Sequence, residues 1–153
     1  MSGIINSAGS KSGVIGTTEL DYEEGTWTVY FADASSGGNV SSTSATGNYI
    51  KVGGLVRLNF QRDAIDTTGC SGTFHIRTLP FTASGFGGGD YYTYRAGGGT
   101  KHHSSMIVQT GTTYMRIHEG TGTDSDTDNW LEFADLVDGA SSLYASIVYR
   151  TTS

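Results

Sequence analysis

Apolar and polar side chains alternate with a period of two along much of this chain, which is the pattern of half-buried β-strands. In the segment 25–32, Trp27, Val29 and Phe31 fall on one face. Threonines and a tyrosine occupy the positions between them. We therefore predict a strand whose aromatic and branched side chains enter a core.

Two further segments, 45–52 and 55–62, flank the dipeptide Gly53-Gly54. Glycine supplies the positive φ that a two-residue hairpin turn requires, so the two segments are predicted to pair as a hairpin. In the second arm the apolar side chains recur at every second position. The expected core residues of this arm are Val56, Leu58 and Phe60.

The rest of the chain continues as short apolar segments separated by polar, Gly-rich turns. Further strands are predicted over 73–78, 91–95, 105–110, 113–118 and 143–151, and loops over 33–44, 85–90 and 119–129. The segment 130–137 fits either one helical turn or a strand with a bulge. This spacing of strands and turns predicts an all-β fold, an antiparallel β-sandwich or jelly roll.

Residues 1–19 differ from this body because small and polar residues dominate them. Two apolar pairs interrupt the segment, Ile4-Ile5 and Val14-Ile15. Such a composition does not fold alone. We predict an extended N-terminal docking arm, followed by one β-domain over 20–153, in which the four apolar side chains Ile4, Ile5, Val14 and Ile15 contact a neighbouring subunit. A frayed tail is the alternative.

The composition suits one domain with a thin core and excludes several classes of function. Of 153 residues, 36% are apolar and 11% aromatic, and the net charge is −6. The 9 basic residues are scattered, so binding of nucleic acid through its phosphates is not expected. No apolar run is long enough to span a membrane, and no secretory signal is visible. The single Cys70 excludes an internal disulfide and a Cys-based zinc site.

The segment Leu20–Thr28 carries the most specific motif of the chain, Leu-Asp-Tyr-Glu-Glu-Gly-Thr-Trp-Thr. It resembles the D-Y-E-E-G-T-W-T signature that opens a small β-module in structural proteins of tailed bacteriophages. A looser likeness continues in Gly47–Phe60, in Leu79–Phe81 and in the closing Tyr-Arg-Thr of residues 149–151. The resemblance implies a part of the virion, made in the host cytoplasm, and not an enzyme.

Two roles in a virion agree with this resemblance. The first is capsid decoration, in which a cement protein binds the assembled shell as a homotrimer beside the major capsid protein. We favour it because the chain shows no heptad pattern, and so no coiled-coil shaft of the kind that carries a fibre tip. The alternative is a tail-fibre or tail-appendage module that contacts a host surface glycan or protein.

One acidic loop offers a candidate metal site. Asp124, Asp126 and Asp128 stand at alternate positions, in the order in which an EF-hand presents oxygen ligands to calcium. The glycine that such a loop needs is replaced by Asn129, and no helices are predicted beside it. A solvated acidic turn is therefore the preferred interpretation. Calcium is the one cofactor considered, and otherwise none is expected.

Three tyrosines, Tyr91, Tyr92 and Tyr94, lie between two Gly-rich segments and are the candidate residues for surface recognition. Tyrosine gives a large, rigid contact area at a small cost in side-chain entropy. A core strand of a tyrosine-rich domain is the alternative, and it is the interpretation that we favour.

No catalytic residues are predicted. Glu23 and Glu24 are adjacent in an extended segment, so their carboxyl groups diverge and cannot face one glycosidic bond. Cys70 and His75 are separated by roughly 16 Å if the segment is extended. Their spacing alone therefore does not indicate a nucleophile and its base.

Overall fold

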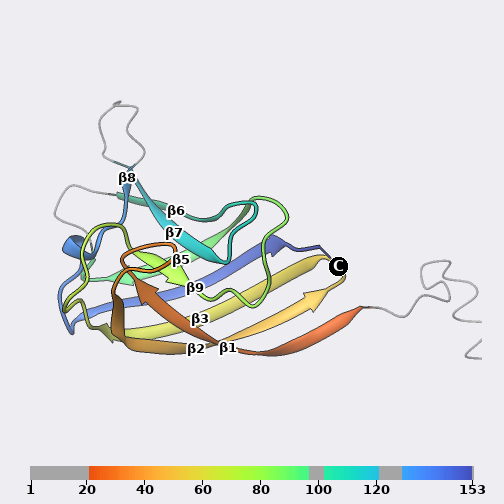
Figure 1. Ribbon diagram of the computed structural model, residues 1–153, viewed down its shortest axis with the longest axis horizontal. Coiled ribbons are helices and arrows are strands. Elements are labelled where there is room, and N and C mark those ends of the chain that lie inside the picture. The colour runs from red at the N-terminus through yellow and green to blue at the C-terminus, as the bar shows by residue number, and fades with distance from the viewer. Residues whose placement is uncertain (1–20, 97–101, 121–128, 153) are drawn as a thin grey trace, which may run out of the picture.

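The computed structural model describes residues 21–96, 102–120 and 129–152, which form strands and a single short 3-10 turn (Figure 1). The strands are β1 (Tyr22–Ala32), β2 (Val40–Val52), β3 (Leu55–Ile65), β4 (His75–Arg77), β5 (Gly87–Tyr94), β6 (His102–Val108), β7 (Tyr114–Gly120), β8 (Asn129–Trp130) and β9 (Ser141–Arg150). The 3-10 turn, η1, covers Phe133–Asp135. In the described part of the chain, no helix has the length and apolar character needed to cross a membrane.

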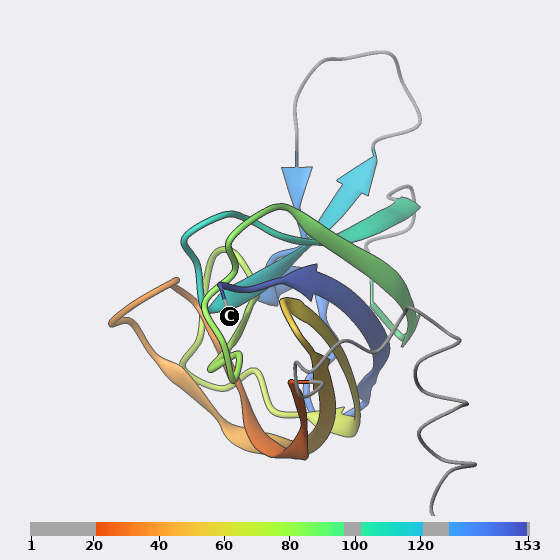
Figure 2. The ribbon, with the colours of Figure 1, turned by 90° about the vertical axis from the view of Figure 1, so that its right-hand side faces the viewer.

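All strand pairs are antiparallel, and the sheet closes on itself. The order is β4-β1-β2-β3-β9-β5-β6-β7, and β7 also pairs with β4, so 8 strands form a closed barrel to which β8 is added. Figure 2 looks along the barrel and shows the strands curving around one interior. The predicted all-β, antiparallel class is confirmed. Closure could not be predicted, because side chains alternate in the same way in a barrel and in a two-sheet sandwich.

The interior is filled by alternate side chains of the strands, and in β1 and β3 these are the residues that the alternating pattern had assigned to a core. Trp27, Val29 and Phe31 of β1 are all buried. So are alternate residues of two other strands, namely Val56, Leu58 and Phe60 in β3 and Leu143, Ala145, Ile147 and Tyr149 in β9. Phe31 stacks on Phe74 with 5.3 Å between ring centroids, and Trp27 meets Phe60 edge-on at 6.0 Å. The aromatic side chains thus join strands that are far apart in the sequence into one core.

The signature segment of β1 is held to β2 by two reciprocal contacts between a glycine and an aromatic ring. Gly25 is opposite Tyr49, and Trp27 is opposite Gly47. A Cβ atom at position 25 would lie 2.9 Å from ring carbons of Tyr49, and one at position 47 would lie 2.7 Å from Cε2 of Trp27. Each ring therefore covers the glycine of the other strand, and the pattern of glycine followed two residues later by an aromatic residue is a packing requirement.

The loop predicted over 85–90 is wrong from Gly87 onward, because β5 begins there. Here glycine permits close packing. A Cβ atom at Gly87 would lie 2.9 Å from Cα of Tyr149, and one at Gly89 would lie 2.9 Å from the carbonyl carbon of Ser146. The two glycines let β5 approach the backbone of β9 more closely than any other residue type would allow.

Two other predictions needed adjustment. The loop predicted over 33–44 ends early, because β2 begins at Val40 and its first residues pair with β1. The hydroxyl of Ser41 donates to the carbonyl of Asp66 at 2.6 Å, which anchors this polar beginning of β2. The segment 130–137 combines both structures that were expected as alternatives, since β8 ends at Trp130 and η1 follows.

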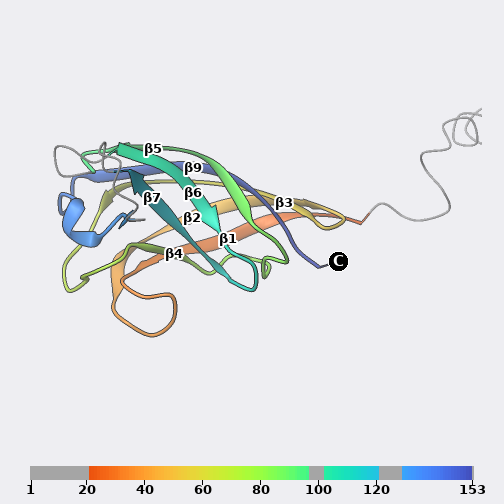
Figure 3. The ribbon, with the colours of Figure 1, turned by 90° about the horizontal axis from the view of Figure 1, so that it is seen from above.

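The described chain enters and leaves the barrel at one place, the turn between β2 and β3. The amide of Gly53 donates to the carbonyl of Asp21 at 2.7 Å, and the amide of Thr151 donates to the carbonyl of Gly54 at 2.9 Å. Gly53 has a φ of 56°, which confirms the predicted tight hairpin. The beginning of β1 and the end of β9 accordingly lie side by side in Figures 1 and 3.

Candidate functional site

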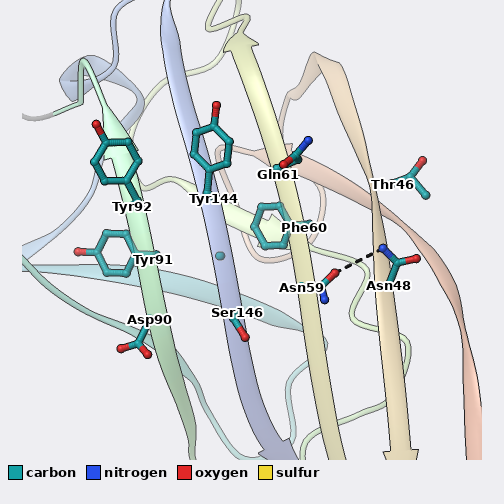
Figure 4. A pocket seen from close by; sticks show the side chains of 11 residues that line it. Thr46, Asn48, Asn59, Phe60, Gln61, Asp90, Tyr91, Tyr92, Tyr144 and Ser146 are labelled. Atoms are coloured by element: carbon teal, nitrogen blue, oxygen red, sulfur yellow. Dashed lines mark hydrogen bonds between the residues drawn. The ribbon is translucent and has the colours of Figure 1, made fainter.

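A shallow groove of about 640 Å³ crosses the outer face of the barrel over β2, β3, β9 and β5 (Figure 4). Its lining consists of Thr46 and Asn48 from β2, Asn59, Phe60 and Gln61 from β3, Tyr144, Ala145 and Ser146 from β9, and Asp90, Tyr91 and Tyr92 from β5. A volume of this size lies in the range of small-ligand sites. The groove is therefore the candidate functional site in the described part of the molecule.

Sheet register gathers the groove residues into two rows. Asn59 is paired with Asn48 on one side and with Ser146 on the other, and Ser146 is paired with Asp90. In the adjacent row, Tyr144 lies between Gln61 and Tyr92. These side chains point outward because they alternate with the buried residues of the same strands. One row is thus polar, and the other is rich in tyrosine.

The two outward tyrosines form the aromatic end of the groove. The rings of Tyr92 and Tyr144 lie 6.0 Å apart between centroids and are tilted by 48°. Tyr92 is 61% exposed, whereas Tyr144 is half-buried. The hydroxyl of Tyr144 donates to Asp63, and this hydrogen bond raises the pKa of Tyr144. Together with a bond from Ser142, it lowers the pKa of Asp63, which is therefore ionised at neutral pH.

The other row supplies groups that both donate and accept hydrogen bonds. Asn48 Nδ2 donates to Asn59 Oδ1 at 3.4 Å, across the β2–β3 pair (Figure 4). Both side chains are exposed and keep further donor and acceptor sites toward solvent. Asp90 is the one charged residue in the lining. The groove is therefore polar and slightly acidic, and its lining contains no basic side chain.

The three predicted recognition tyrosines do not act as a set. Tyr92 and Tyr94 are exposed on the outer face of β5. Tyr91 is half-buried and packs against the core from the opposite face. Burial, and to a smaller extent the nearby carboxylate of Glu119, raises the pKa of Tyr91 to about 12. Of the three, Tyr92 stands with another outward tyrosine in the groove.

Sequence reasoning missed the other outward residues of the groove, namely Thr46, Asn48, Asn59, Gln61, Asp90, Tyr144 and Ser146. They come from the β2–β3 hairpin and from β5 and β9, which follow much later in the sequence. The alternation of each strand does mark them as outward positions. That signal becomes informative only when the register between strands is known.

Several other predicted site residues lie outside the described residues, namely Ile4, Ile5, Val14 and Ile15 of the predicted arm and Asp124, Asp126 and Asp128 of the acidic loop. Among the residues that the structure does describe, no three His, Cys, Asp or Glu side chains gather as a metal site. The calcium prediction therefore stays a prediction.

The remaining candidate groups have structural partners. Glu23 accepts a hydrogen bond from the Tyr49 hydroxyl at 2.6 Å, and Glu24 accepts one from Tyr22 at 2.5 Å. Burial raises the pKa of the Cys70 thiol, which disfavours the nucleophilic thiolate. Glu23 thus links β1 to β2, whereas the bond of Glu24 lies within β1.

A second surface of note lies beside the β2–β3 turn. Exposed apolar side chains gather there on the outer faces of β1, β2, β3 and β9, and we call them the apolar strip: Tyr22, Ile50, Val52, Leu55 and Val148. Register places three of them next to one another, since Val52 pairs with both Tyr22 and Leu55, whereas Arg57 lies between Ile50 and Val148. A group of exposed apolar side chains with charged residues among them is typical of protein contact sites.

No family model and no curated protein matches this chain. A solved structure resembles it. The crystal structure of Dettilon tailspike protein (gp208) matches with a TM-score of 0.58 over 84% of this chain and 24% of the tailspike chain. Sequence identity over the match is 16%, so the likeness concerns the fold. The chain spans 24% of the length of that protein.

Proposed function

We propose that this protein is a non-enzymatic structural module of a tailed-bacteriophage virion, located on the tail. The observation that carries the proposal is the likeness of 84% of the chain to part of a tailspike protein. The resemblance of Leu20–Thr28 to a signature of phage structural proteins supports it independently. Glu23 of that signature bonds across the β1–β2 pair, as expected for a residue with a structural role.

Within the virion the module works by adhesion to its neighbours. Covering the apolar strip stabilises an assembly by roughly 25 cal/mol for each Å² of apolar area that is removed from water. We propose that further copies of this chain cover it and that the module is a homotrimer. In a cyclic trimer each subunit contacts the next through two complementary patches, and the third subunit contacts the first, which closes the ring.

The copy number in purified particles tests the location. Particles of the phage that encodes the chain are digested, and the chain is quantified by mass spectrometry against the major capsid protein. A tail module should be present in a few dozen copies or fewer, and gold-labelled antibodies against the chain should mark the tail tip. Hundreds of copies per particle would support capsid decoration instead. Absence from the particle would contradict a virion role altogether.

A further inference from the structure

We propose that the groove over β2, β3, β9 and β5 is a binding site for a neutral oligosaccharide. The inference goes beyond the virion role and does not depend on it, because it rests on side chains within the domain itself. Its elements are an aromatic surface, a row of hydrogen-bonding groups and the charge of the lining.

The aromatic surface comes from Tyr92 and Tyr144. A sugar ring presents a face of C–H groups, and an aromatic ring packs against such a face while its hydroxyl stays in contact with water. The hydrogen bond from Tyr144 to Asp63 holds one ring in place, and the second ring lies 6.0 Å away. Little side-chain entropy is therefore lost when a ligand is bound.

The polar row suits the hydroxyl groups of a sugar. Each hydroxyl can both donate and accept a hydrogen bond, and so can the amide side chains of Asn48 and Asn59 in this row and of Gln61 in the adjacent row. Asn48 and Asn59 lie on paired strands, and Ser146 and Asp90 continue their row. Four strands about 4.8 Å apart span about 14 Å, which leaves room for a short chain of sugars along the row.

Charge selects the class of saccharide. Asp90 is the one charged residue of the lining, and the ionised carboxylate of Asp63 lies beside Tyr144 at its aromatic end. No basic side chain lines the groove to pair with a carboxylate or a phosphate. Within the lining an acidic saccharide would meet no cation, and the exposed Arg57, two residues before Asn59 on the same face, lies outside the lining. We therefore expect the groove to prefer neutral sugars.

Binding is tested with the full-length protein labelled with ¹⁵N. Maltohexaose, cellohexaose, mannohexaose and chitohexaose are the neutral probes, and hexamers of galacturonic acid and of sialic acid are the acidic ones. Amide shifts are followed up to about 10 mM sugar, because an affinity in the millimolar range is measurable there. We expect at least one neutral probe to shift amides of β5 and β9, and neither acidic probe to bind as tightly.

Variants assign the binding to the groove. Tyr92→Ala removes an exposed ring and should weaken binding about tenfold or more, whereas Tyr144→Phe keeps its ring and should weaken binding much less. The matched control is Tyr30→Ala, because Tyr30 is also an exposed tyrosine on the outside of the barrel but does not line the groove. Unchanged amide spectra away from the substitution confirm that each variant is folded.

The proposal is overturned if no neutral probe shifts the spectrum, if an acidic hexamer binds more tightly, or if Tyr92→Ala and Tyr30→Ala weaken binding equally. None of these results bears on the copy number in the particle. The sugar site and the virion role can therefore fail separately.

Discussion

At the scale of single residues, Asp66 joins the end of β3 to the beginning of β2. Its carboxylate accepts hydrogen bonds from the Ser42 hydroxyl and from the amide of Thr68. Its own amide donates to the hydroxyl of Thr43 at 3.2 Å. The bonds from Ser42 and Thr68 lower the pKa of Asp66 to about 2. Protonation of this one carboxylate therefore disfavours the folded chain.

This pKa predicts an acid-dependent loss of stability. Because the pKa is lower in the folded state than the usual value of 3.8, the contribution of Asp66 is complete above that value and disappears as the pH falls toward 2. We expect the melting temperature of Asp66→Asn to depend less on pH between about 5 and 2 than that of the wild type.

Ser42→Ala should flatten the same profile, since it removes the largest cause of the lowered pKa. Ser44→Ala is the control, because Ser44 is an exposed serine of the same strand. Parallel profiles for Asp66→Asn and the wild type would show that these bonds do not couple protonation to folding.

At the scale of elements, β5 shows how a Gly-rich segment can be an ordered strand. A Cβ atom on Gly87 or Gly89 would overlap the backbone of β9, whereas one on the intervening Gly88 would lie 3.5 Å from the carbonyl oxygen of Met106, an ordinary van der Waals contact. Successive glycines of the strand face opposite sides of the sheet, so positions that have no room for a side chain alternate with positions that have room. Neighbouring glycines should therefore differ sharply in their tolerance of a methyl group.

Gly89→Ala should destabilise the protein by about 1–3 kcal/mol or more, because the new methyl group overlaps the backbone of β9. Gly88→Ala, in the same strand, should change the free energy of unfolding by about 0.5 kcal/mol or less. Urea denaturation of both variants measures the difference. Equal destabilisation by the two substitutions would contradict the idea that overlap with the backbone of β9 determines where the strand accepts a side chain.

The same element shows what the sequence could predict. Alternation in β1 and β3 sufficed to assign strands and core, because apolar residues at every second position leave one interpretation, whereas in β9 it sufficed to assign the strand. In β5 the glycines carry no side chain and so no alternation, and their role depends on how closely β9 lies. β4 has 3 residues, and its pairing with β7 closes the barrel across a long separation in sequence. No local pattern encodes that pairing.

At the scale of the whole molecule, the groove could be predicted only with the same non-local information, namely which strands are neighbours. Tyr92 was a candidate from the sequence because it lies among tyrosines. Its partner Tyr144 comes from the last strand, and the amides of Asn48 and Asn59 come from a hairpin that was predicted correctly. Their outward orientation followed from the pattern. Their meeting on one surface followed only from the order of the strands around the barrel.

The apolar strip gives the whole molecule a testable state of assembly. We expect the protein to sediment as a trimer, and the double variant Ile50→Ser, Leu55→Ser to sediment as a monomer, because both side chains are exposed in the single subunit. Val137→Ser is the matched control, since Val137 is exposed outside the strip. Sedimentation equilibrium at micromolar concentration distinguishes the states. A monomeric wild type, or a trimeric double variant, would contradict the proposed interface.

The shared position of Asp21 and Thr151 beside one turn has a consequence for protein engineering. A unit whose two ends meet can be inserted into a loop of an unrelated carrier with little distortion of either polypeptide. New termini could likewise be opened in the loop between β1 and β2 after Asp21 and Thr151 are joined by a short linker. The barrel is thus suited to circular permutation and to display on a scaffold, with the loop between β1 and β2 directed away from the point of attachment.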